Sequence, residues 1–178
     1  MLVAFPMSKT HGLPKQKYTQ TEMSSKLKRY NIPNAAYFIT TKTLDNKPLF
    51  HDDKAAVIFT DTLYYCRQRY GFLLAAFVLM PDHLHALIMP KNGHTISAVM
   101  QKIKSLVAKR LREETGQSGN IWQKSFYDFI VISQERLLEK IQYIHNNPVR
   151  KGLANTIKEF SYSSANKKYE NDLQRILG

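Results

Sequence analysis

Cysteine is almost absent from this chain, which has a single one, Cys66, among 178 residues. One cysteine forms no internal disulfide, and together with scattered histidines it does not supply the four ligands of a structural zinc site. The shortage indicates a reducing compartment, so we expect a cytoplasmic protein in which Cys66 is a packing residue.

Long apolar runs are missing as well. No stretch of the sequence reaches the ~18 consecutive apolar residues of a membrane span. The apolar start of the chain lacks the basic region and the cleavage site of a signal peptide, and no glycine-rich phosphate-binding loop is present. We therefore expect no membrane-spanning segment and no nucleotide cofactor.

Acidic residues are scarce. The chain has 14 Asp and Glu against 26 Lys and Arg, which gives a net charge of +12 and a pI of about 9.8. Such an excess favours a polyanionic partner. An anionic membrane surface is the alternative that the charge leaves open, but nucleic acid is the leading class, and we expect it rather than a membrane.

The hydrophobic pattern predicts strands over residues 35–42, 72–80, 83–89 and 126–133. It predicts helices over residues 53–70, 95–114 and 134–147, the last ended by Pro148. The first six elements follow the order of a split βαβ, ferredoxin-like α+β fold with an antiparallel sheet. The seventh is an extra C-terminal helix, free to cover the open face of the sheet.

The length suits one domain. We assign it to residues 29–165, preceded by a basic, loosely ordered arm over residues 1–28 and followed by a C-terminal tail over residues 166–178.

Two histidines, His83 and His85, begin the third predicted strand. Side chains alternate along a strand, so the two imidazoles share a face while Leu84 points to the other layer. Neutral imidazoles are common metal ligands, and this pair is placed to converge on one ion. Taken alone, the pair also fits two histidines hydrogen-bonded at a sheet edge.

The last predicted helix carries a tyrosine away from its apolar stripe. Leu137, Ile141 and Ile144 form the stripe, whereas Tyr143 and Asn147 lie one turn apart on the polar face. A tyrosine used for packing would join the stripe. Tyr143 is therefore a candidate nucleophile, although exposed tyrosines are common.

Together these residues fit attack on a phosphodiester. A divalent ion held by His83, His85 and the Asn147 oxygen would offset charge on the phosphate. Tyr143 would attack it with help from the ion or from Lys140, and the resulting ester would conserve the energy needed to rejoin strands.

Basic residues supply candidate DNA contacts. The polar face of the helix over residues 95–114 is suited to tracking phosphates, but an ordinary solvated face fits each residue equally well. The predicted contacts on this helix, on the tyrosine helix and beyond it are Lys102, Lys104, Lys109, Arg112, Lys140, Arg150 and Lys151. Trp122, Phe126 and Tyr127 would either stack on bases or pack in the core.

Four segments resemble the single-tyrosine HUH transposases, in their REP-associated tyrosine transposase branch. They are residues 79–85 (LMPDHLH), residues 121–128, residues 143–153 (YIHNNPVRKGL) and residues 162–164 (YSS). The asparagine four residues after the tyrosine is typical of this branch. The likeness spans residues 30–164, and it departs where Phe129 follows Tyr127 and Asp128, because relatives often carry a histidine there.

The resemblance implies a ferredoxin-like fold with Mg²⁺ or Mn²⁺ bound by His83, His85 and Asn147. It implies a 5′-phosphotyrosine at Tyr143, a free 3′-hydroxyl, and single-stranded DNA with hairpins of palindromic repeats as substrate. Both monomeric and homodimeric members exist, so we leave the assembly open.

Three other readings compete with this one. A relaxase or replication initiator is disfavoured by the order of the motifs and the short chain. An RNA-binding ferredoxin-like module predicts aromatic strand motifs that are absent. A domesticated protein that binds DNA hairpins without cutting them remains the main alternative.

Overall fold

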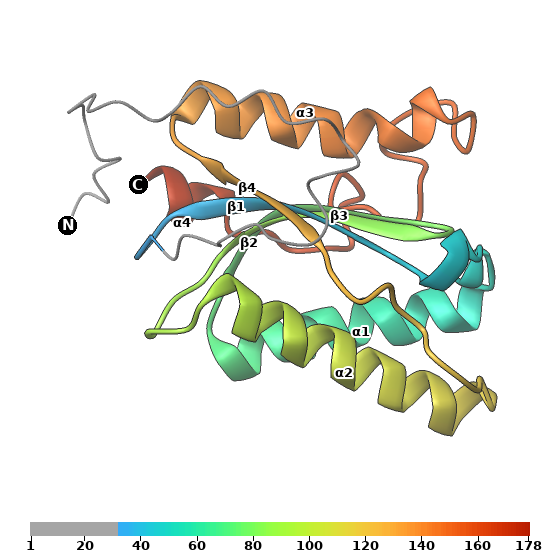
Figure 1. Ribbon diagram of the computed structural model, residues 1–178. Helices are drawn as coiled ribbons and strands as arrows, with labels where there is room; N and C mark the ends of the chain where they lie inside the picture. The colour runs from blue at the N-terminus through green and yellow to red at the C-terminus, as the bar shows by residue number, and fades with distance from the viewer. Residues whose placement is uncertain (1–31) are drawn as a thin grey trace, which may run out of the picture.

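The structure, a computed structural model, describes residues 32–178 and consists of three layers. A four-stranded antiparallel sheet lies in the middle, with two long helices below it and a third above it (Figure 1). The basic arm predicted for residues 1–28 lies outside the described residues. Within residues 32–178, no helix combines the length and the apolar character of a membrane span.

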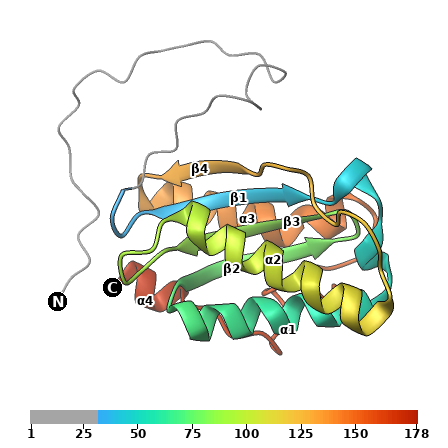
Figure 2. The ribbon, with the colours of Figure 1, turned by 60° about the horizontal axis from the view of Figure 1, so that its bottom comes forward.

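The elements follow the predicted order. The strands are β1 (Ala36–Lys42), β2 (Leu73–Met80), β3 (His83–Met89) and β4 (Tyr127–Val131). The helices are α1 (Asp53–Tyr70), α2 (Ile96–Thr115), α3 (Gln134–Arg150) and α4 (Leu173–Leu177), with two short 3-10 helices, η2 (Leu44–Asn46) and η3 (Leu49–His51). The strands lie in the order β2-β3-β1-β4, which can be followed in Figure 2.

Local signals account for the helix ends. The Asp52 carboxylate accepts a hydrogen bond from the Ala55 N–H at the start of α1, and Thr95 does the same for Ala98 at the start of α2. Gly71 and Gly116 end these helices in the left-handed conformation, which a residue without Cβ adopts at little cost.

The sheet separates two apolar cores, because its side chains alternate between the two faces. One core joins the sheet to α1 and α2 and includes Cys66, which is fully buried as predicted for a packing residue. The other core lies beneath α3 and α4, where Leu137, Ile141 and Ile144 pack on the sheet. Helix α3 therefore covers the face that the split βαβ order leaves open.

The predicted end of the last helix at Pro148 is wrong, because α3 continues through Pro148 to Arg150. Pro148 lacks an N–H, which removes one bond to the preceding turn. The turn beyond it recovers bonds: Lys151 N–H donates to the Asn147 carbonyl and Leu153 N–H to the Pro148 carbonyl, at 3.1 and 2.9 Å. Asn147 and Pro148 are buried against the sheet, and this packing holds both residues in helical geometry.

The C-terminal segment covers the outer edge of β2, a role that the sequence did not predict. Leu79 N–H donates to the Tyr162 carbonyl at 2.8 Å, and Ser164 N–H donates to the Phe77 carbonyl at 2.9 Å. Farther along, Asp172 N–H donates to the Leu74 carbonyl at 2.8 Å. An open edge strand is a template for wrong pairing, so these bonds protect the sheet.

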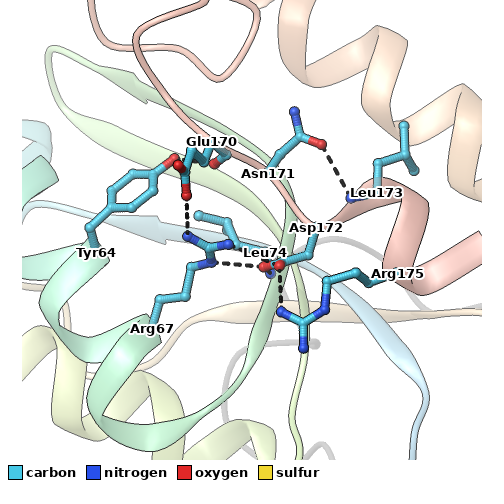
Figure 3. Close-up of polar contacts among 8 residues, drawn as sticks. All are labelled: Tyr64, Arg67, Leu74, Glu170, Asn171, Asp172, Leu173 and Arg175. Atoms are coloured by element: carbon cyan, nitrogen blue, oxygen red, sulfur yellow. Dashed lines mark hydrogen bonds and ion pairs between the residues drawn. The ribbon is translucent and has the colours of Figure 1, made fainter.

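Asp172 anchors this segment (Figure 3). Its carboxylate, only 2% exposed, accepts bonds from Arg67 Nε at 2.7 Å, Arg67 Nη2 at 2.9 Å and the Leu74 N–H at 2.9 Å. Arg175 Nη1 adds a contact at 2.9 Å. Burial raises the pKa of Asp172, but the bonds from Arg67 and Leu74 outweigh it and lower this pKa below its ordinary value.

We expect Asp172→Asn to lower the free energy of unfolding by about 3 kcal/mol at pH 7, because it removes one charge from a largely buried pair. The folded pKa of Asp172 is lowered, so its stabilisation is present above the ordinary pKa of ~3.9 and disappears as the pH falls through the lowered value. The difference in the free energy of unfolding between wild type and variant, measured by urea titration, should therefore be smaller at pH 3 than at pH 7.

Glu170→Gln is the matched control. Glu170 lies 3.7 Å from the same Arg67 but its side chain is almost fully exposed. An exposed pair contributes little, so this variant should unfold like the wild type. Equal losses of unfolding free energy in the two variants would show that the buried carboxylate is not the anchor. A loss in Asp172→Asn that does not change with pH would show the same.

Candidate active site

Strand β3 places His83 and His85 on the sheet face beneath α3. In the register, His85 lies opposite Thr40 of β1 and Val78 of β2. Leu84 belongs to the opposite core, with Ala86 and Ile88. The alternation predicted for this strand is confirmed, and both imidazoles face the side of the sheet that α3 covers.

Each imidazole is fixed through one ring nitrogen. Nδ1 of His83 lies 2.5 Å from an oxygen of Asp82, and Nδ1 of His85 lies 2.8 Å from the Thr40 hydroxyl. The two Nε2 atoms face one another at 3.2 Å. In the tautomer in which each Nδ1–H donates to its partner, both Nε2 atoms keep a lone pair that is available to a cation, as in metal-binding histidines.

The protein holds His85 in the neutral form. Burial first of all, together with the positive charges of His83 and Lys42, lowers the pKa of His85 to about 3 against an opposite effect of Asp82. A neutral imidazole keeps a lone pair at neutral pH, which a cation ligand requires.

Asn147 brings a polar atom without a partner to the same place. Its side chain is 6% exposed, and Oδ1 is buried with no hydrogen bond to any described residue. Leaving a buried acceptor unpaired costs about 1–3 kcal/mol. Asn147 and the two histidines line one pocket of about 470 Å³, so a cation there would satisfy this oxygen.

Tyr143 lies on α3 one turn before Asn147 and lines the same pocket. Its ring centre is 5.4 Å from that of His85 and 5.8 Å from that of Phe38, both edge to face. Lys140 Nζ and the Arg150 guanidinium lie 5.9 and 5.8 Å from the Tyr143 ring centre. The candidate nucleophile is therefore half-exposed beside two cations.

Two imidazole nitrogens and one amide oxygen around this polar pocket could together hold a divalent cation. No group of three or more His, Cys, Asp or Glu in residues 32–178 is placed to hold a metal. The third candidate donor in this pocket is the amide oxygen of Asn147, and asparagine is not among those four residue types. His83, His85 and Asn147 are the side chains of this pocket that could hold a cation.

The predicted DNA contacts fall on opposite sides of the sheet. Lys151 lines the pocket, and Lys140 and Arg150 flank Tyr143. The four predicted contacts on α2 lie across the sheet from Tyr143 (Figure 1), and they are Lys102, Lys104, Lys109 and Arg112.

Several of the α2 residues have local partners. Lys104 Nζ donates to the Gln123 carbonyl at 2.8 Å, and Arg112 donates to the Gly119 carbonyl at 3.2 Å. Lys109 lies 3.8 Å from Glu113. The loop between α2 and β4, which contains Gly119 and Gln123, also carries Trp122. The Trp122 ring packs against Phe50 and Phe59 in the core.

Sequence reasoning missed three polar side chains of the pocket: Thr40, Lys42 and Asp82. Asp82 precedes His83 directly, so its position next to the histidine in the sequence was a signal that could have identified it. Thr40 and Lys42 come from another strand, and only the β1–β3 register brings them opposite the histidines. His145 bonds the Ser164 hydroxyl at 2.9 Å and ties α3 to the C-terminal segment.

Comparison with known proteins identifies relatives of this chain. The chain is 27% identical over 107 residues to a Haemophilus influenzae protein provisionally named a REP-associated tyrosine transposase; the match covers 54% of this chain and 61% of that relative, less than two thirds of its length. A REP-associated tyrosine transposase of Escherichia coli K12 is 23% identical over 141 residues, covering 79% of this chain and 82% of the relative.

A solved structure of a REP-associated tyrosine transposase bound to a REP hairpin has the same fold, with a TM-score of 0.70 and 21% identity. The superposition covers 86% of this chain and 88% of that one. The family described as transposase IS200 like matches residues 32–147, more than half of the chain and all of the pocket residues up to Asn147. The protein therefore belongs to the IS200-like transposase family.

Proposed function

We propose that this protein is a metal-dependent endonuclease and strand transferase for single-stranded DNA, built on a ferredoxin-like domain. It would cleave and rejoin DNA through a covalent 5′-phosphotyrosine at Tyr143. The observation that carries the proposal is one pocket that joins two facing Nε2 atoms, the unpaired Asn147 oxygen and the Tyr143 ring. The REP hairpin bound by the structural relative supports hairpins of palindromic repeats as the substrate.

His83, His85 and Asn147 would hold Mg²⁺ or Mn²⁺, and no nucleotide cofactor is needed. When bound, the ion supplies positive charge that polarises the phosphodiester and offsets charge in the transition state. Asp82 and Thr40 keep both imidazoles oriented through their Nδ1 atoms.

Tyr143 would act as the nucleophile. Its phenol oxygen bonds to phosphorus, and the bond from phosphorus to the 3′ oxygen breaks. The leaving oxygen takes up a proton and the phenol proton passes to solvent. Lys140 and Arg150, on either side of the ring, attract the phosphate and hold it near the phenol oxygen. A free 3′-hydroxyl then attacks the ester, which releases Tyr143 and rejoins the strand.

The first expected outcome is a covalent adduct. Labelled single-stranded DNA from both flanks of the gene, incubated with Mn²⁺ or Mg²⁺, should yield a protein-linked band on a denaturing gel. Tyr143→Phe should abolish the band because the nucleophilic oxygen is gone. His83→Ala should slow its formation by about 100-fold or more, and EDTA should prevent it.

Tyr65→Phe serves as the control, because Tyr65 is also exposed but lies on α1. It should form the adduct at the wild-type rate. If hairpin DNA binds tightly and no adduct forms with any metal or flank sequence, the protein is a hairpin-binding relative without cleavage activity.

The second expected outcome separates stability from function at Asn147. Asn147→Ala should change the free energy of unfolding by less than about 1 kcal/mol, because it removes an acceptor that has no partner. It should also abolish the rise in melting temperature that Mn²⁺ causes in the wild type. A variant that Mn²⁺ still stabilises fully would remove Asn147 from the ligand set.

The third expected outcome concerns Thr40. Thr40→Val keeps the shape but removes the hydroxyl next to His85 Nδ1, so it should weaken Mn²⁺ binding by about 10- to 100-fold. Thr41→Val is the matched control: Thr41 is buried on the opposite face, and its hydroxyl has no partner among the described residues. Titration by Mn²⁺ electron paramagnetic resonance should show wild-type affinity for Thr41→Val, and equal affinities for both variants would contradict the positioning role.

A further inference from the structure

Strand β4 carries two exposed aromatic side chains at the rim of the sheet. Tyr127 and Phe129 are 43% and 40% exposed, whereas Val131 on the same strand is buried beneath α3. Among the described residues β4 pairs only with β1, so it forms an edge of the sheet. Exposing two neighbouring aromatic rings is unfavourable in water, and such a patch marks a binding surface.

The strand register extends this patch to the active site. Tyr127 lies opposite Thr40, and Phe129 lies opposite Phe38. Directly opposed residues of an antiparallel pair project from the same face of the sheet. Thr40 bonds His85, and the Phe38 ring stacks on His85 at 5.5 Å, so both exposed rings stand on the face that holds the histidines.

Lys140 lies close both to the exposed ring of Phe129 and to Tyr143, the proposed nucleophile. Lys140 Nζ lies 5.8 Å from the ring centre of Phe129, 5.5 Å from that of Phe38 and 5.9 Å from that of Tyr143. Glu139 is 3.7 Å from Lys140 but also 2.7 Å from Arg136, so its single charge is shared between two cations. Lys140 therefore keeps a positive charge next to the rings of Phe38, Phe129 and Tyr143.

This combination matches unpaired nucleotides. A base offers a flat π face to an aromatic ring, and the phosphate beside it is an anion for Lys140. A duplex buries its base faces, so it offers the rings much less. A second copy of the chain would bring together two molecules that each carry a net charge of +12, which opposes pairing.

We propose that Tyr127 and Phe129 form a stacking platform for the unpaired bases next to the cleaved phosphate, with Lys140 holding the phosphate between the platform and Tyr143. The inference rests on the proposed function for the identity of that phosphate. It adds to that function the surface that selects single-stranded DNA over duplex.

The test measures binding without cleavage. The full chain, in EDTA, is titrated into a fluorescein-labelled single strand of fifteen thymidines and, separately, into a blunt duplex of the same length, followed by anisotropy. Phe129→Ala and Tyr127→Ala should each weaken single-strand binding by about 5- to 100-fold, and Phe129→Trp should retain it. Duplex binding should change by less than about 2-fold, because stacking makes no contribution there.

Ile132→Ala is the control, since Ile132 is an exposed apolar residue just beyond β4 that lies outside both the platform and the pocket. It should bind like the wild type. Lys140→Ala should reduce the salt dependence of single-strand binding, whereas the loss caused by Phe129→Ala should persist from 50 to 300 mM salt.

Three outcomes of these measurements would overturn the stacking platform, and a fourth would separate it from the proposed cleavage activity. Wild-type single-strand affinity in Phe129→Ala and Tyr127→Ala would overturn it, as would an equal loss for single strand and duplex. A wild-type dimer that these variants convert to monomer in sedimentation would also overturn it, because β4 would then be an interface between copies. If single-strand binding falls as expected while the wild type forms no adduct with any metal, the platform stands and the proposed cleavage activity fails.

Discussion

The structure depends on the pairing of β3 between β1 and β2. This central position fixes the alternation of the strand, which sends Leu84 into one core and both histidines to the other face. A slip of one residue would bury the imidazoles under α1 and α2 and expose the apolar residues. The orientation of His85 depends on this register, because the Thr40 hydroxyl meets His85 Nδ1 only when the register holds.

Helix α3 supplies side chains of the pocket that the sheet does not. Its apolar stripe packs over the same face, so residues on the flank of the stripe are carried to the histidines. The C-terminal segment supports this packing from the other edge, through the Asp172 anchor and the bond between His145 and Ser164. The pocket therefore rests on packing and hydrogen bonds from separate parts of the chain.

Much of this arrangement could be predicted from the sequence, because it depends on local periodicity. Alternation around Leu84 gave the shared face of the histidines, and helical spacing put Tyr143 and Asn147 on one flank. What could not be predicted depends on pairing between distant segments. Thr40 enters the site through strand register, Asp172 reaches Arg67 across more than one hundred residues, and α3 passes through Pro148 because tertiary packing outweighs a local helix signal.

The central claim is that the Tyr143 oxygen becomes joined to the 5′ end of the cut strand. Mass spectrometry of the protein after incubation with Mn²⁺ and flanking single-stranded DNA, followed by nuclease and protease digestion, tests it most directly. We expect the peptide that contains Tyr143 to carry a nucleotide linked through its 5′ phosphate. A nucleotide on any other residue, or a cut strand with no modified peptide under any metal, would contradict the account.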